Sequence, residues 1–267
     1  LGDVYKRQIQ YVRNFQKFRP LLGELVMRDV KIKYRKSVLG VLWTLLNPLL
    51  MMAVLSIVFS HLLRFNVENY PVYILSGQVM YNFFSEATSS AMTSILNNAP
   101  LIKKVYIPKY LFTFARIASS VINIMASFAA LILVMVFMRM ELHYTLFLGI
   151  IPLFCVIVLA TGVGLILATA TVKFRDIMHL YGVFLTALTY LCPVIYPMTF
   201  LSEGSLIYTI VSLNPLTIIM NMFRDLVIYG VMPSIGSFVA AIGISGIVLA
   251  IGLYVFYKKQ DTFILNL

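Results

Sequence analysis

Charged residues are scarce in this sequence of 267 residues, of which only 12% are Asp, Glu, Lys or Arg and 61% are apolar. Soluble domains carry about 25% charged residues. With a mean hydropathy of +0.92, the composition therefore indicates a polytopic membrane protein. Two cysteines and three histidines offer no disulfide framework, no paired zinc ligands and no Ser-His-Asp arrangement. Cys155 and Cys192 lie in apolar runs and are expected to be buried packing residues.

The loop that many ATPases use to bind phosphate is also missing. Because no Gly is followed by Lys anywhere, the pattern Gly-x-x-x-x-Gly-Lys-[Ser/Thr] cannot occur. The chain is therefore expected not to hydrolyse ATP by that route. Acidic and histidine side chains do not gather at one depth of the apolar stretches, so neither a catalytic centre nor a metal site is expected.

Six stretches are long and apolar enough to cross a bilayer core, which needs about 20 residues per helix. They are Val38–Leu63, Tyr70–Ile95, Leu111–Met138, Leu146–Thr171, Leu180–Leu201 and Ile235–Tyr257. Residues 1–37 are polar and basic, without the apolar run of a signal peptide. The sequence thus predicts an all-α integral membrane protein with a cytoplasmic segment (1–37), a six-helix domain (38–257) and a cytoplasmic tail (258–267).

Basic residues are distributed unevenly between the two sides of these spans. If the N-terminus is cytoplasmic, all but three of the 21 Lys and Arg residues fall on the inside. The exceptions are Arg64, Arg139 and Arg224. This positive-inside bias predicts that both termini are cytoplasmic. The net charge of +11 is then a sign of sidedness, and no nucleic-acid partner is expected.

An amphipathic helix is predicted ahead of the first span, from Pro20 to about Lys36. Its polar sector consists of Glu24, Arg28, Lys31 and Arg35. Asp29 and Lys33 lie four residues apart on the apolar side, where they could pair with each other or with a partner protein. The helix is expected to lie in the cytoplasmic interface, either as an anchor to anionic membrane lipid or as a binding surface.

Between the fifth and sixth spans, the outside stretch 202–234 holds two apolar pieces that are too short to cross, Leu206–Leu213 and Leu216–Ile228. Asn214-Pro215 separates them. A pair of short re-entrant helices is predicted, with helices lying flat on the outer leaflet as the alternative.

A polar face follows the second span at steps of three and four residues. It consists of Gln78, Asn82, Ser85, Ser89, Thr93 and Asn97, with Glu86 adjacent. Such a face either packs on neighbouring helices or lines a hydrated conduit. Arg116 in the third span is the predicted counter-charge of Glu86.

The fifth span contains Pro193 and Pro197, so its outer half is expected to be kinked or broken. The aromatic residues Tyr190 and Tyr196 lie there, either in an interfacial belt or as platforms on which sugars stack along a conduit. Glycines in the fourth and sixth spans predict close helix packing. They are Gly162, Gly164, Gly243, Gly246 and Gly252.

The inside segment 97–110 reads N-N-A-P-L-I-K-K-V-Y-I-P-K-Y. Its apolar residues alternate with lysines between two prolines, which is typical of a short amphipathic element that docks into something. This segment resembles the cytoplasmic coupling helix of the membrane subunits of ABC-2 type polysaccharide exporters, which move O-antigen, capsule and teichoic-acid chains. Three further stretches agree: Arg28 to Pro48 (R-D-V-K-I-K-Y-R-K-S-V-L-G-V-L-W-T-L-L-N-P), Phe174 to Leu180 (F-R-D-I-M-H-L) and Leu213 to Arg224 (L-N-P-L-T-I-I-M-N-M-F-R). Together the resemblance covers residues 15–260.

The resemblance implies a permease of the bacterial inner (cytoplasmic) membrane. It would work as a homodimer with two copies of an ABC ATPase subunit, which would bind the ATP and Mg²⁺, while this chain binds no cofactor. The residues implied to couple to the ATPase are Asn98, Pro100, Leu101, Ile102, Lys103, Lys104, Tyr106 and Pro108. Arg28, Lys31 and Arg35 would meet the phosphate of a polyprenyl-linked glycan at the entrance.

Three alternatives remain open from the sequence. The first keeps the ABC-2 scaffold but assigns a smaller cargo, such as a lipid, a drug or a lipo-oligosaccharide. The second is a membrane-embedded enzyme that acts on a polyprenyl-linked sugar, which would require clustered acidic residues or histidines. The third is a structural or channel protein that needs no ATPase.

Overall fold

Every secondary-structure element in the described residues is a helix, as expected of an all-α chain. The structure is a computed structural model that describes residues 18–33, 35, 37–62, 67–105 and 107–263. The sequence segments 1–17 and 264–267, and the predicted coupling residue Tyr106, lie outside the described residues.

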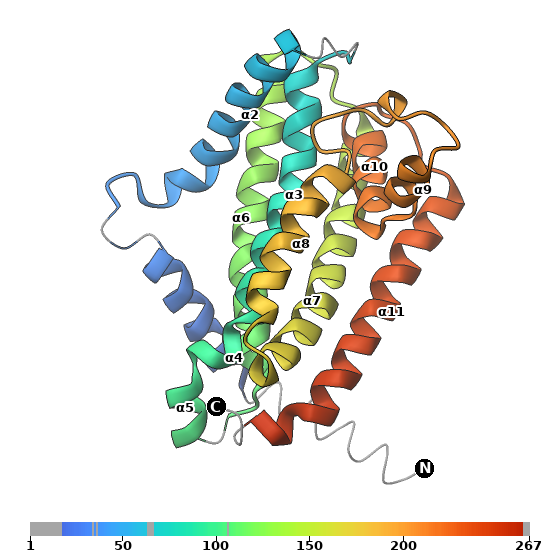
Figure 1. Cartoon of the computed structure of the whole chain (residues 1–267). Coiled ribbons are helices and arrows are strands. Elements are labelled where there is room, and N and C mark those ends of the chain that lie inside the picture. Colours follow the sequence, from blue (N-terminus) through green and yellow to red (C-terminus); the bar gives the residue numbers. More distant parts are fainter. Residues whose placement is uncertain (1–17, 34, 36, 63–66, 106, 264–267) are drawn as a thin grey trace.

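Helices α3 (Tyr70–Met92), α6 (Tyr110–Phe137) and α7 (Ile150–Lys173) form a bundle, and α11 (Ile235–Lys259) packs along α7 (Figure 1). Helix α2 (Trp43–Leu62) contacts α3 and α6. Helix α8 (Ile177–Leu191) lies against α3 and α7. The short helices α4 (Ser94–Asn97) and α5 (Ala99–Lys104) lie at one end of the bundle, named here the α5 end.

The α10 end, opposite, carries α9 (Leu206–Leu213) and α10 (Pro215–Val227). These two helices are bent by 73° at Asn214, so the stretch forms two short helices as predicted. Asn214 begins α10 because its side-chain Oδ1 accepts a hydrogen bond from the Leu216 backbone N–H at 3.0 Å, and Pro215 fits the first helical turn.

Three helices of the described chain are long and apolar enough to cross a membrane, and four are if the bent pair counts as one. The three are Tyr110–Phe137, Tyr144–Lys173 and Ile235–Thr262. Helix α8 ends at Leu191, two residues before Pro193, so the predicted break of the fifth span is confirmed. The count of six spans stays a prediction.

Close packing between α7 and α11 depends on two glycines. A Cβ built on Gly162 would come within 2.6 Å of the Val248 and Leu249 backbone, and one on Gly252 within 2.4 Å of the Gly162 carbonyl oxygen. The predicted role of these glycines is confirmed. Gly243 and Gly246 have no atom of the described chain within 4 Å of such a Cβ, so they take no part in close packing within this chain. The predicted burial of Cys155 and Cys192 is confirmed.

Candidate coupling and entrance site

The helix at residues 18–33 lies across the α5 end of the bundle (Figure 1). Pro20 lies in this helix, as predicted. Leu25 is 5% exposed and packs in a cluster with Ile95 of α4, Ile102 of α5 and Phe112 of α6. The apolar side of this helix thus joins the core that surrounds the predicted coupling segment.

Helices α4 and α5 divide the coupling segment into an inner and an outer surface. Pro100 lies in the first turn of α5, where its missing N–H costs no helical hydrogen bond. Ile102 is only 6% exposed, whereas Lys103, Lys104 and Val105 are exposed. The expectation that Ile102 docks into another subunit is therefore wrong, because this side chain is buried within its own chain.

A polar network joins the amphipathic helix to α4–α5 and to α6. Arg28 Nη2 donates to Asp29 Oδ1 at 3.0 Å and to Asn98 Oδ1 at 3.2 Å. Asp29 is 7% exposed, and its Oδ2 lies 3.4 Å from Arg116 Nε. Asn98 Nδ2 in turn donates to the Ser94 carbonyl oxygen at 2.7 Å. The carboxylate of Asp29 thus connects the amphipathic helix to α6, and the amide of Asn98 connects it to the turn between α4 and α5.

Glu86 of α3 forms its ion pair with the same helix and accepts a hydrogen bond from α6. Lys33 Nζ lies 2.7 Å from Glu86 Oε1, and Asn123 Nδ2 donates to the same oxygen at 2.7 Å. The predicted Glu86–Arg116 pair is therefore wrong, because Arg116 is engaged by Asp29. Asp29 and Lys33 do not form an ion pair with each other, since Asp29 binds Arg116 of α6 and Lys33 binds Glu86 of α3.

The proposed phosphate-binding residues differ in their surroundings. Arg28 is engaged by Asp29 and Asn98, and 39% of its side chain is exposed. Lys31 and Arg35 are exposed. Of the three, Lys31 and Arg35 are thus accessible to a ligand, while Arg28 holds the helix to α4–α5.

The polar face of α3 changes character along its length. Gln78 is 4% exposed and packs inside the chain, whereas Asn82 is exposed and Ser85 and Ser89 are half-buried. Beside this face, Tyr81 and Thr88 tie α3 to α8. Tyr81 Oη donates to the Leu185 carbonyl oxygen at 2.6 Å, and Tyr181 Oη donates to Thr88 Oγ1 at 2.6 Å. The face therefore packs against neighbouring helices at Gln78, whereas from Asn82 toward the α5 end it is open and could line a conduit.

The two tyrosines of the predicted conduit lie where α8 ends. Tyr190 is 69% exposed, and Tyr196 Oη donates to the Tyr190 carbonyl oxygen at 2.7 Å. The Tyr196 and Phe200 rings have centroids 6.4 Å apart. The broken end of α8 thus presents a partly exposed aromatic surface.

Arg224 of α10 was not assigned a role from the sequence, yet it is 2% exposed. Its guanidinium donates to Ser76 Oγ at 3.1 Å and to Tyr73 Oη at 2.8 Å, and lies 3.6 Å from the centre of the Tyr73 ring. It also donates to the carbonyl oxygens of Tyr73 and Val194. The sequence signal for this role was the single Arg within the apolar run of α10. A cation at a buried position requires hydrogen-bond partners, so its presence there indicates a polar site.

No three His, Cys, Asp or Glu side chains of the described residues lie close enough together to hold a metal ion. The arrangement instead links an exposed basic surface on α5 with a helix across the bundle end and with a polar face of α3. Such a connection can transmit a movement of α5 to the interior of the bundle.

A family model for the ABC-2 type transporter matches residues 20–228 of the chain. The chain belongs to the ABC-2 type transporter family. This family is the membrane component of ABC transporters, and its matched region contains the amphipathic helix, α5 and α10.

Relatives match along most of their own length. The chain is 29% identical over 259 residues to an O-antigen export system permease protein, RfbA, of Myxococcus xanthus, with 96% of this chain and 98% of the relative covered. It is 24% identical over 246 residues to the protein of the same name from Klebsiella pneumoniae, covering 91% and 93%. It is also 24% identical to the polysialic acid transport protein KpsM of Escherichia coli, covering 77% and 80%. The ABC-2 resemblance of the sequence motifs is thereby confirmed.

Proposed function

We propose that this chain is the permease subunit of an ABC exporter that moves a polyprenyl-(pyro)phosphate-linked polysaccharide or teichoic acid outward across the bacterial inner membrane. The observation that carries the proposal is the match to O-antigen permeases over 96% of this chain. ATP and Mg²⁺ bind in a separate ATPase subunit, and two copies of each subunit make the working complex.

In this proposal, α2, α3, α6, α7, α8 and α11 are the six spans, and both termini are cytoplasmic. The α5 end then faces the cytoplasm, which the concentration of Lys and Arg on that side supports. The fifteen residues of α8 rise only about 22 Å, so the turn that follows must complete the fifth span. The bent pair α9–α10 then lies at the outer side as a re-entrant or interfacial pair.

The exposed residues Lys103, Lys104 and Val105 form the proposed contact with the ATPase. When ATP brings the two ATPase subunits together, α5 moves with them. Buried Ile102 then transmits the movement to the cluster around Leu25 and Phe112, while Asn98 transmits it to Arg28. ATP thereby favours one arrangement of the permease dimer over another.

At the cytoplasmic entrance, Lys31 and Arg35 bind the phosphate of the lipid-linked polymer. Both are exposed, and cationic side chains form strong charge-assisted hydrogen bonds with phosphate. The open part of the α3 polar face, from Asn82 to Ser89, lines the conduit between the two copies. The tyrosines at the outer end of α8, Tyr190 and Tyr196, supply stacking surfaces where the sugar leaves.

The alternatives predict different chemistry. A membrane enzyme would gather carboxylates or histidines, whereas Glu86 is bound by Lys33 and Asn123. A channel that needs no ATPase would leave the exposed basic surface of α5 without a role. A smaller cargo on the same scaffold is tested by the choice of substrate in the export assay.

The proposed function is tested with the chain co-purified with its ATPase and reconstituted into vesicles. Lipid-linked O-antigen or teichoic acid is expected to stimulate ATP hydrolysis and to become accessible on the far side of the membrane. Stimulation by short lipo-oligosaccharides alone would favour the smaller cargo. No stimulation by any lipid-linked glycan would contradict the proposal.

The contact with the ATPase is tested by charge reversal. Lys103→Glu with Lys104→Glu is expected to reduce co-purification of the ATPase. Lys258→Glu with Lys259→Glu is the matched control. These lysines are exposed at the end of α11 on the same side of the molecule, and the two substitutions change the net charge by the same amount. Equal loss with both pairs would argue against a specific contact at α5.

A further inference from the structure

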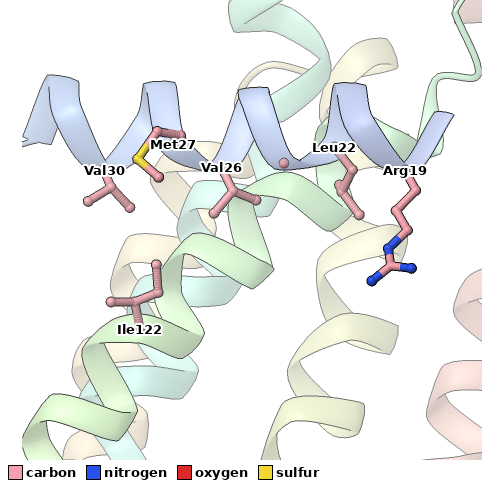
Figure 2. Close-up of a pocket in the computed structure, with 7 residues that line it drawn as sticks. Arg19, Leu22, Val26, Met27, Val30 and Ile122 are labelled. Atoms are coloured by element: carbon pink, nitrogen blue, oxygen red, sulfur yellow. The ribbon is translucent and has the colours of Figure 1, made fainter.

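A groove of about 420 Å³ lies between the N-terminal amphipathic helix and α6. Leu22, Val26, Met27 and Val30 line it from the helix, and Ile122 lines it from α6 (Figure 2). Arg19 lies at one end of the same row (Figure 2). The groove is a separate surface from the polar network of Arg28, Asp29 and Asn98.

The lining of the groove is apolar and open to the surroundings. Met27 is 53% exposed and Ile122 is 43% exposed. Met125, three residues further along α6, is 46% exposed and continues the apolar strip away from the amphipathic helix. A flexible chain of methylene groups can follow such a strip, because contact between apolar surfaces has no directional requirement.

Arg19 gives the groove a charged end. It lies three residues before Leu22 and seven before Val26, so all three side chains share one face of the helix. Figure 2 shows the guanidinium pointing toward the same side as these apolar side chains. Arg19 is exposed, and no acidic side chain of the described residues forms an ion pair with it.

We propose that this groove binds one acyl chain of an anionic phospholipid, with the lipid phosphate at Arg19. The charge and the apolar strip match the two parts of such a lipid. An amphipathic helix at a membrane surface buries its apolar face among the headgroups and upper acyl chains, where this ligand is abundant. The volume lies within the range of ligand sites, about 300 to 1,000 Å³.

The bound lipid fills the space between the amphipathic helix and α6 and thereby stabilises the position of the helix. This role is distinct from transport, since the lipid is a structural component and not the cargo. It requires the helix to lie at a membrane surface but does not require a polysaccharide substrate. Failure of this inference and failure of the export function are therefore distinguishable.

Gly23 provides a direct way to block the groove. It lines the groove, and a Cβ built on it meets no atom of the described chain within 4 Å. Gly23→Phe therefore adds a ring at the wall of the groove, where its Cβ has room. Gly243→Phe is the matched control, because Gly243 is an exposed helical glycine on α11 with equally open surroundings.

The test is a titration of the purified full chain in detergent with dioleoylphosphatidylglycerol and, separately, dioleoylphosphatidylcholine, followed by native mass spectrometry. The wild-type chain and Gly243→Phe are expected to bind the anionic lipid more tightly. Gly23→Phe is expected to lose one bound lipid per chain. Arg19→Gln is expected to reduce the preference for the anionic lipid about fivefold, the effect of one basic residue at an anionic surface.

Equal binding of both lipids by the wild-type chain and by Gly23→Phe would overturn the proposal. Displacement of the bound lipid by polyprenyl phosphate at equal concentration would overturn it in favour of the cargo carrier. A change from dimer to monomer in Gly23→Phe, with lipid binding unchanged, would overturn it in favour of a second copy of this chain as the occupant.

Discussion

Arg28 Nη2, on the helix that crosses the α5 end, donates a hydrogen bond to Asn98 Oδ1, on the turn between α4 and α5, at 3.2 Å. The two residues are 70 positions apart in the sequence. Asn98 is 6% exposed and also holds the Ser94 carbonyl oxygen, so it cannot move without its turn. A displacement of α5 would thereby reach the amphipathic helix through one side chain.

Breaking this link is expected to weaken the stimulation of ATP hydrolysis by the substrate. Arg28→Gln and Asn98→Ala should each leave the ATPase bound, since neither residue is on the exposed surface of α5, but reduce substrate-stimulated ATPase activity several-fold. A hydrogen bond to a charged group contributes about 1.5–3 kcal/mol, less where the side chain is partly exposed. The measurement is ATPase activity of the reconstituted complex with and without lipid-linked glycan.

A double-mutant cycle separates this link from unrelated damage. If Arg28 and Asn98 act through one hydrogen bond, the combined variant should be little worse than either single variant. Glu24→Gln is the control, because Glu24 is an exposed residue of the same helix. Strictly additive losses would show that the two residues act independently.

The Lys33–Glu86 pair is expected to affect transport more than stability. Its side chains are 46% and 38% exposed, and exposed ion pairs contribute about 0–1 kcal/mol. Glu86→Gln should therefore change the unfolding temperature by little, while releasing the amphipathic helix from α3 and reducing export. Measuring both quantities for the same protein distinguishes the two effects.

Exchange of the two charges provides the decisive comparison. Lys33→Glu alone places two carboxylates together and should impair export, whereas Lys33→Glu combined with Glu86→Lys should recover part of the activity. The effect of Lys33→Glu should also weaken at high salt, because exposed charges are screened. If the exchanged pair remains as impaired as the single variant, the ion pair has no role in export.

The elements of this site were predictable where local chemistry decides the structure. Asn214-Pro215 separates two helices because Asn caps a helix and Pro starts one, and Pro193 stops α8. The partner of Glu86 was not predictable in this way. Hydropathy places residues along a span but not around it, and it could not show that the helix at 18–33 crosses both α3 and α6.

The same limit explains the error at Ile102. Apolar residues among lysines indicate a surface that docks, but the pattern is identical whether the docking partner is another subunit or the same chain. Here Ile102 is buried in one cluster with Leu25 of the amphipathic helix and Phe112 of α6. Arg224 was missed for a related reason, since its partners Tyr73 and Ser76 are about 150 residues away in sequence.

Arg224 is expected to be a major contributor to stability. Arg224→Met removes the hydrogen bonds of the guanidinium to Ser76, Tyr73 and Val194, and a hydrogen bond to a charged group contributes about 1.5–3 kcal/mol. Arg224→Lys should recover little, because an ammonium group cannot reproduce the planar fork. Thermal unfolding in detergent should show a clearly lower midpoint for both variants.

Arg139→Lys serves as the control for Arg224→Lys, since Arg139 is exposed. Its unfolding midpoint should remain within error of the wild type. An Arg224→Lys variant as stable as the control would mean that the guanidinium contacts contribute little. In that case, α10 would be held to α3 mainly by its apolar side chains, such as Phe223.

The contact between α7 and α11 is expected to depend on the missing side chain of Gly162. Alanine there would place its Cβ 2.6 Å from backbone atoms of Val248 and Leu249, which cannot move aside as a flexible side chain could. The helices must separate, and the loss of packing should outweigh the better helix propensity of alanine, about 1 kcal/mol. Gly243→Ala gains the same propensity without a clash. Thermal unfolding should therefore move in opposite directions for the two variants, down for Gly162→Ala and unchanged or up for Gly243→Ala. Equal midpoints would show that α7 and α11 tolerate separation, and that their close approach is not what holds α11 in place.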